Sequence, residues 1–267
     1  MKAEEEKDKE YLGLFLTPLY ECRNYKPKLG HKASEGYDLN QFLTLYNSDP
    51  FYTWIGLDSP FMFAAHKAAG GMTSIYRQIG IGCERLLRAI LADSLEYESA
   101  SDVQWSYETK TKAGKDKTLY LDGFIDLDKI KNEIRKEVVC RWIAGFSERN
   151  NLNRKNFRGI VFEVRQGYKS KDAKRQNADI DNATVAYASD LIPVFAIFSS
   201  QIDDDIIRRY RNNKCGILIG NLSNDPFSSI YAFCDRVLGY NLSAFFERNT
   251  ELIRNEIQFI LKSLLTA

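Results

Sequence analysis

The segment 157–193 constrains the fold most strongly, because it places charged residues inside an apolar strand. It reads FRGIVFEVRQGYKSKDAKRQNADIDNATVAYASDLIP. The alternation of a strand puts Glu163 and Arg165 on one face, two residues apart. A carboxylate is costly to bury in apolar surroundings unless another group pairs with it. We therefore expect a functional site on this strand, followed by a basic segment and a helix that packs on a sheet.

Composition narrows the chemistry of that site. The chain has 267 residues and a net charge of only +1, so attraction to nucleic acid must come from local patches. Its five dispersed cysteines include no C-x-x-C pair, which predicts reduced thiols in a cytoplasmic protein and not a disulfide framework. With only two histidines, a Cys/His zinc site and a histidine-based triad are disfavoured. The charged N-terminus does not resemble a signal peptide, and no apolar run is long enough to span a membrane.

A helix is predicted over about 74–95, where apolar residues recur at intervals of three and four. Glu84 lies at the edge of its apolar face. One interpretation is a surface carboxylate that pairs with Arg88 four residues later. The other is an acid that the helix points into a metal site.

A β-hairpin is predicted next, with strands over 103–109 and 118–128 around the turn AGKDK. Asp122, Asp126 and Asp128 share one face of the second strand. Neighbours on one face are about 6.6 Å apart, too far for adjacent carboxylates to chelate one ion unaided. One of Asp122 and Asp126 is therefore expected to act.

The rest of the chain predicts a two-part organisation. Residues 11–73 are rich in aromatic residues and turn signals, and we expect 1–73 to form an N-terminal extension packed on the core. The core would span 74–267. It would hold a helix within 129–157, a buried strand at 191–199, further helices and strands, and a C-terminal helix.

The order helix, strand, strand, strand, helix, strand over about 74–200 resembles that of the PD-(D/E)xK nuclease superfamily, in particular type II restriction endonucleases. The resemblance rests on Asp122 or Asp126 in LDGFIDL, on Glu163 in FEVR and on the basic segment that follows. Glu84 matches an acid that many such enzymes carry on the preceding helix. The resemblance implies an α/β (α+β) fold whose mixed central sheet is flanked by helices.

The same resemblance implies Mg²⁺, held by Asp126 and Glu163, with Asp122 as a further candidate ligand. Arg165 stands where the family has lysine. Arginine stays protonated and cannot act as a base, but it can clamp a phosphate. Alternatively, Lys169 or Lys171 fills this role from a displaced position.

The basic segment has a second expected use, since a short polar run past the catalytic lysine enters the major groove in several restriction endonucleases. Its residue types suit base edges and phosphates. These candidates are Lys169, Lys171, Asp172, Lys174, Arg175, Gln176 and Asn177. The alternative is a solvated helix N-terminus that makes ordinary phosphate contacts.

The leading hypothesis is a Mg²⁺-dependent endonuclease that cuts double-stranded DNA at a specific sequence and acts as a homodimer. Three alternatives stay open. The chain could be a nuclease-like fold that binds DNA without cutting it, or a nuclease of repair or recombination. It could also be an unrelated α/β protein in which Glu163 and Arg165 form a simple ion pair.

Overall fold

A computed structural model describes residues 2–29, 35–110, 114–153, 156–168 and 172–265. The chain divides into two compact units: Met1–Gly82 with Arg248–Ala267, and Cys83–Glu247. The boundary expected near residue 73 therefore falls later, inside the long helix α4 (Pro60–Leu95). The C-terminal helix also belongs to the first unit and not to the core.

Contacts distant in sequence explain why the C-terminal helix α10 (Thr250–Leu265) joins the first unit. Arg23 donates two hydrogen bonds to Glu256, at 2.8 and 2.6 Å. Gly71 of α4 lies so close to Leu264 that a Cβ there would be 2.5 Å from the leucine Cδ2. The other helices of this unit are α1 (Lys2–Tyr20), α2 (Leu39–Asn47) and α3 (Pro50–Trp54).

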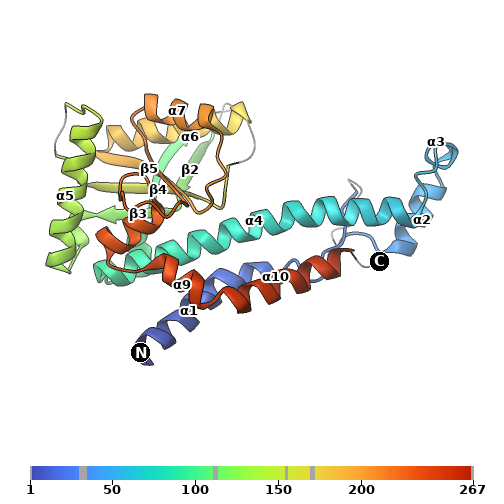
Figure 1. The fold of residues 1–267 in the computed structure, drawn as a ribbon. Coiled ribbons are helices and arrows are strands. Elements are labelled where there is room, and N and C mark those ends of the chain that lie inside the picture. Colours follow the sequence, from blue (N-terminus) through green and yellow to red (C-terminus); the bar gives the residue numbers. More distant parts are fainter. Residues whose placement is uncertain (1, 30–34, 111–113, 154–155, 169–171, 266–267) are drawn as a thin grey trace. The chain divides into compact units, whose positions relative to one another are not determined.

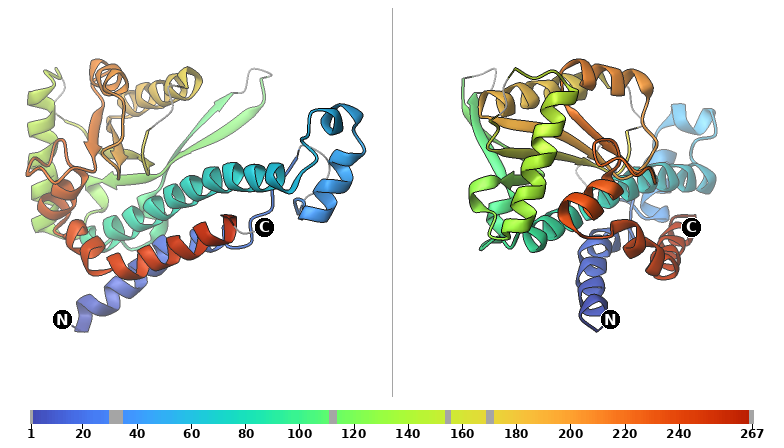
Figure 2. Two further views of the ribbon diagram at one scale, coloured as in Figure 1. Left: turned by 45° about the vertical axis from the view of Figure 1, so that its right-hand side comes forward. Right: turned by 60° about the vertical axis from the view of Figure 1, so that its left-hand side comes forward.

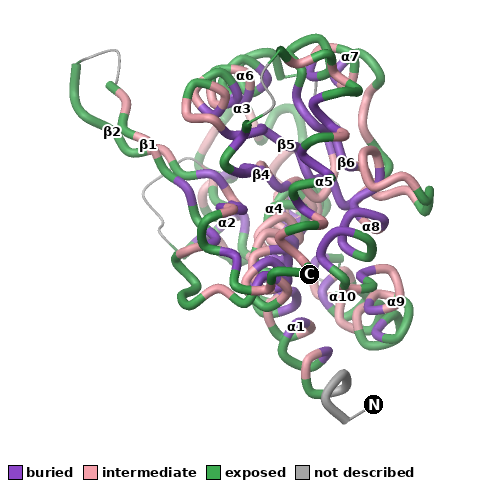
Figure 3. The backbone as a smooth tube through the Cα atoms, turned by 90° about the vertical axis from the view of Figure 1, so that its left-hand side faces the viewer, coloured by how far each residue is buried: buried purple, intermediate pink, exposed green. Residues whose placement is uncertain are grey.

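The second unit is built on a mixed four-stranded sheet in the order β3-β4-β5-β6, of which Figure 1 labels β3, β4 and β5. The strands are β3 (Gly123–Asp126), β4 (Gly159–Arg165), β5 (Leu191–Ile197) and β6 (Gly216–Ile219). Strand β3 is antiparallel to β4, and the other two pairs are parallel. Figure 3 shows β4 and β5 largely buried.

The predicted hairpin is present as the strands β1 (Trp105–Lys110) and β2 (Asp116–Leu121). They pair only with each other and form a separate antiparallel sheet among the described residues. The second strand of the predicted hairpin is therefore divided: its first half is β2, and its second half is β3, which joins the four-stranded sheet (Figure 2).

Helices cover both faces of the four-stranded sheet, which confirms a mixed sheet flanked by helices. On one face Val161 packs with Ala186 of α6 (Ala173–Ala188). On the other face the ring of Phe162 lies 5.7 Å from that of Phe233 in α8 (Ile230–Phe233). The remaining elements are η1 (Ala100–Val103), η2 (Leu127–Lys129), α5 (Glu133–Arg149), α7 (Asp204–Asn212), η3 (Cys234–Leu238) and α9 (Leu242–Arg248).

Gly159 allows β3 to approach β4 closely, because a Cβ at this residue would lie 1.9 Å from the carbonyl oxygen of Ile125. A backbone atom cannot move aside as a flexible side chain can. We expect Gly159→Ala to lower the free energy of unfolding by about 1–3 kcal/mol in urea titrations. Gly167→Ala is the matched control, because its Cβ would meet nothing closer than 3.5 Å. Equal stability of the two variants would contradict this account of the strand pair.

Within the described residues, no helix combines the length and the apolar character that crossing a bilayer requires.

Candidate active site

The backbone fixes Asp122 beside β4. It lies between β2 and β3, where its N–H donates to the carbonyl of Phe162 at 2.9 Å. Its carboxylate oxygen Oδ2 accepts a hydrogen bond from the N–H of Val164 at 2.8 Å. These two bonds flank Glu163 in the sequence, so they bring Asp122 to the level of Glu163 on the neighbouring strand.

Glu163 is a buried carboxylate, with 14% of its side chain exposed. Its Oε1 forms an ion pair with Nη1 of Arg165, two residues later on the same face. Burial raises the pKa of Glu163 to about 7, and the negative charges of Asp122 and Asp179 add to that rise. The positive charge of Arg165 opposes it without cancelling it. Loss of solvation is therefore the main cause of the raised pKa of Glu163.

The structure does not bring Asp126 to Glu163, although we expected these two residues to hold one ion. Asp126 is opposite Gly159, four residues before Glu163 on β4. At 3.3 Å per residue that separation is about 13 Å along the strand. Asp126 instead caps η2, where its carboxylate accepts from the N–H of Asp128 at 3.2 Å. Asp122 takes its place beside Glu163.

Glu84 combines both of its expected interpretations. It pairs with Arg88 at 2.6 Å, one turn further along α4. Burial raises the pKa of Glu84, and the charge of Asp122 adds to that rise, so the two carboxylates influence each other. Arg88 in turn donates from Nε to the backbone carbonyl of Asp122 at 2.5 Å. Helix α4 thus contributes one acid and one cation to the surroundings of Asp122.

Arg165 lies among three carboxylates. Its Nη1 contacts Glu163 and lies 4.0 Å from Oδ2 of Asp122, and its Nη2 donates to Oδ1 of Asp179 at 3.0 Å. The charges of these acids outweigh the lowering effect of burial, so the pKa of Arg165 is raised and its guanidinium stays charged. Glu163 and Asp122 therefore both lie near the same cationic nitrogen.

Asp179 was missed by the sequence analysis. It is only 3% exposed and lies on the face of α6 that packs on the sheet, four residues before the buried Ala183. The spacing was the available signal, because a charged residue in register with the apolar stripe of a helix needs a partner. Its partners are Arg165, Tyr168 and Tyr210.

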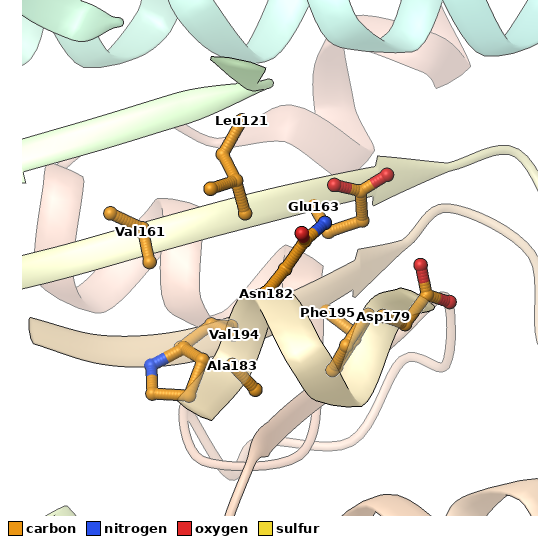
Figure 4. Close-up of a pocket in the computed structure, with 9 residues that line it drawn as sticks. Leu121, Val161, Glu163, Asp179, Asn182, Ala183, Val194 and Phe195 are labelled. Atoms are coloured by element: carbon orange, nitrogen blue, oxygen red, sulfur yellow. The ribbon is translucent and has the colours of Figure 1, made fainter. Parts of the chain in front are cut away.

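A small cavity separates α6 from β4 and β5 directly beside these acids. Figure 4 shows Glu163 on the strand, with Asp179 and Asn182 on the helix, around its polar side. Asn182 accepts a hydrogen bond from the hydroxyl of Tyr107 at 2.6 Å, which ties β1 to α6. The rest of the lining is apolar: Leu121, Val161, Ala183, Pro193, Val194 and Phe195.

The carboxylate pair can be compared with the needs of Mg²⁺, which proteins commonly hold by one or two carboxylates with water in its other positions. Asp122, just before β3, and Glu163, on β4, supply that number. Burial is the main cause that raises the pKa of both carboxyls. Across the described residues, no three His, Cys, Asp or Glu side chains are grouped to hold a metal by themselves. The residues therefore fit a Mg²⁺ that keeps several of its waters, and do not fit a fully protein-ligated ion.

The predicted DNA-reading residues have different environments. Lys169 and Lys171 lie outside the described residues. Asp172 is the N-cap of α6, with its carboxylate accepting from the N–H of Lys174 at 2.9 Å and of Arg175 at 3.4 Å. Lys174 and Arg175 are exposed at the first turn of α6.

The two amide residues among these candidates, Gln176 and Asn177, both contact Arg209 of α7. Gln176 is buried, and its side-chain oxygen accepts from Nη1 of Arg209 at 2.8 Å. Asn177 is exposed, and its side-chain oxygen accepts from Nη2 of the same arginine at 2.5 Å. The expectation that Gln176 reads a base is therefore not supported, because its amide oxygen is engaged and its side chain faces the protein.

No family model, curated protein or solved structure matches this chain in comparisons with known proteins.

Proposed function

We propose that the chain is a Mg²⁺-dependent endonuclease that hydrolyses double-stranded DNA, with a PD-(D/E)xK-like core. The observation that supports it is the placement of Asp122, just before β3, and Glu163, on β4, whose partly buried carboxylates both lie within 4.0 Å of Nη1 of Arg165. Two neighbouring carboxylates repel each other, and a divalent cation bound between them would relieve that repulsion.

In this proposal Asp122 and Glu163 would hold the ion. When bound, Mg²⁺ supplies a polarised phosphate and a water with a lowered pKa. Arg165 offers a permanent positive charge for a phosphate oxygen, and it cannot act as the base. Glu84, whose pKa is raised by burial, would accept a hydrogen bond from a water on the α4 side.

The first turn of α6 would contact the DNA. Lys174 and Arg175 are exposed there, and the helix N-terminus adds a favourable partial charge for phosphate. Arg175 also acts on the acids, because its charge lowers the pKa of Asp122. A type II restriction activity on a palindromic site, carried out by a homodimer, is the specific form that we propose.

The test is incubation of plasmid and phage DNA with the protein and Mg²⁺. Discrete fragments are expected from the wild type, and Glu163→Gln should abolish them, since it removes a metal-binding charge at nearly constant volume. Glu137→Gln is the control, because Glu137 is exposed on α5 and pairs with Arg141 on the same helix. Absence of cleavage by the wild type with either Mg²⁺ or Mn²⁺ would overturn the proposal.

A second candidate function is DNA binding without cleavage. It is favoured by the ion pair between Arg165 and Glu163, which neutralises one of the two candidate ligands. This alternative predicts binding that weakens steeply with salt and does not depend on divalent cations. A repair or recombination nuclease would instead nick particular DNA structures and leave intact duplex plasmid uncut.

A further inference from the structure

We infer that Asp179 is a positioning residue that holds Arg165 by one nitrogen, so that the arginine can release Glu163 to a divalent cation and still remain in the site. The inference rests on the proposed function, because it concerns the same pair of carboxylates. It assigns a role to the buried residues Asp179, Tyr168 and Tyr210, which would touch neither the metal nor DNA.

Asp179 is itself firmly fixed. Its Oδ2 accepts hydrogen bonds from the hydroxyl of Tyr210 at 2.6 Å and from that of Tyr168 at 3.2 Å. The two hydroxyls lie 3.0 Å apart. Burial raises the pKa of both tyrosines, so they remain protonated donors. The remaining oxygen, Oδ1, receives Nη2 of Arg165 at 3.0 Å.

Two of the ion pairs of Arg165 differ in how they are held, while its Nη1 also donates to the carbonyl of Val164 at 3.3 Å. The fixed contact joins Nη2 to Asp179, which has 3% exposure and two tyrosine donors of its own. The replaceable contact joins Nη1 to Glu163, whose carboxylate is also a candidate ligand of the cation. A dication at Glu163 and Asp122 would repel Nη1 but need not disturb the bond of Nη2.

The hydrogen bonding of Arg165 is also incomplete in the present arrangement. Its Nε is buried and has no hydrogen-bond partner among the described residues. An unpaired buried donor is unfavourable, and such groups often mark functional sites. A small rotation of the guanidinium about the Asp179 contact would therefore not break a fully satisfied set of bonds.

Removing the Asp179 charge should leave Arg165 with Glu163 and Asp122 as its remaining anionic partners. The arginine would then compete more strongly with a cation for those carboxylates. We expect Asp179→Asn to raise the Mg²⁺ concentration for half-maximal effect by about tenfold, the scale seen when a residue behind a metal ligand is changed. Tyr210→Phe, which removes one donor to Asp179, should give a smaller shift in the same direction.

The experiment measures the melting temperature of the full chain as Mg²⁺ or Ca²⁺ is titrated without DNA. Cleavage is then measured at saturating Mg²⁺. The expected result is a higher half-saturating concentration in both variants, with cleavage largely recovered at saturation. Tyr187→Phe is the control, because its hydroxyl bonds to the carbonyl of Lys214 outside this network. Tyr210→Phe keeps the test valid if Asp179→Asn does not fold.

The outcomes separate the two proposals. If the wild type responds to the cations but both variants have the wild-type half-saturating concentration, Asp179 is purely structural and the inference is overturned. If the wild type shows neither stabilisation nor cleavage with any of these cations, the proposed function fails and the inference fails with it.

Discussion

Replacing Arg165 by methionine is expected to lower the free energy of unfolding by about 3–5 kcal/mol at pH 7.5, the cost of removing one partner from a buried ion pair. The change leaves Glu163, Asp122 and Asp179 without the cation that they share. Methionine keeps most of the side-chain volume, so the loss reports the charge and not a cavity. Chemical denaturation followed by circular dichroism measures it.

The deficit should shrink as the pH falls. Burial already raises the pKa of Glu163 from 4.5 to about 7, and loss of the arginine charge raises it further. Between the unfolded pKa of 4.5 and the raised pKa of the folded state, the folded protein binds more protons than the unfolded chain. The free energy of unfolding therefore falls as the pH rises between these two values. The Arg165→Met variant should therefore approach the wild type near pH 5.

Arg141→Met provides the control, because Arg141 is exposed on α5 and pairs with Glu137 at 2.9 Å. Its effect should stay within about 0.5 kcal/mol at either pH. A deficit for Arg165→Met as small as that of this control, or one that grows towards pH 5, would show that the buried acids do not depend on the arginine.

The second large effect distinguishes the two aspartates of LDGFIDL. If the protein is a metal-dependent nuclease, Asp122→Asn should lower the rate of DNA cleavage by about 10²–10³-fold. That loss is typical of removing one group that stabilises charge in the transition state. The asparagine oxygen can still accept the hydrogen bond from Val164, so the fold should be retained. Single-turnover cleavage at saturating Mg²⁺ measures the loss.

Asp126→Asn is the matched control, with the same chemical change four residues away. Asparagine is as good an N-cap as aspartate, so the cap of η2 should survive, and cleavage should stay within about threefold of the wild type. The reverse pattern, with Asp126 essential and Asp122 dispensable, would place the reacting centre at the other end of β3.

The sequence predicted the elements around the site better than it predicted their register. Alternation correctly placed Glu163 and Arg165 on one face, where they form an ion pair. It also placed Asp122 and Asp126 on a common face, but alternation cannot say which of them meets Glu163. That choice depends on the pairing of Asp126 with Gly159, a contact between segments 33 residues apart.

Asp179 and Gln176 show the same limit from the helix side. Both lie on the buried face of α6, which the sequence analysis expected to pack on a sheet without naming either residue as buried. Their environments are set by residues of α7, Tyr210 and Arg209, which lie 31 and 33 residues further along the chain. Side-chain chemistry suggested a base-reading amide at Gln176, and tertiary packing decided otherwise.

The hairpin β1–β2 has a consequence for the behaviour of the folding chain. Its two strands pair with each other alone in the described residues, and Figure 3 shows its far end exposed. Open strand edges can recruit other chains into aggregates. Here charged side chains occupy the exposed half, with Lys110 opposite Asp116 and Lys117 opposite Thr109. Placing charges there protects the edge from aggregation while the four-stranded sheet assembles around Glu163.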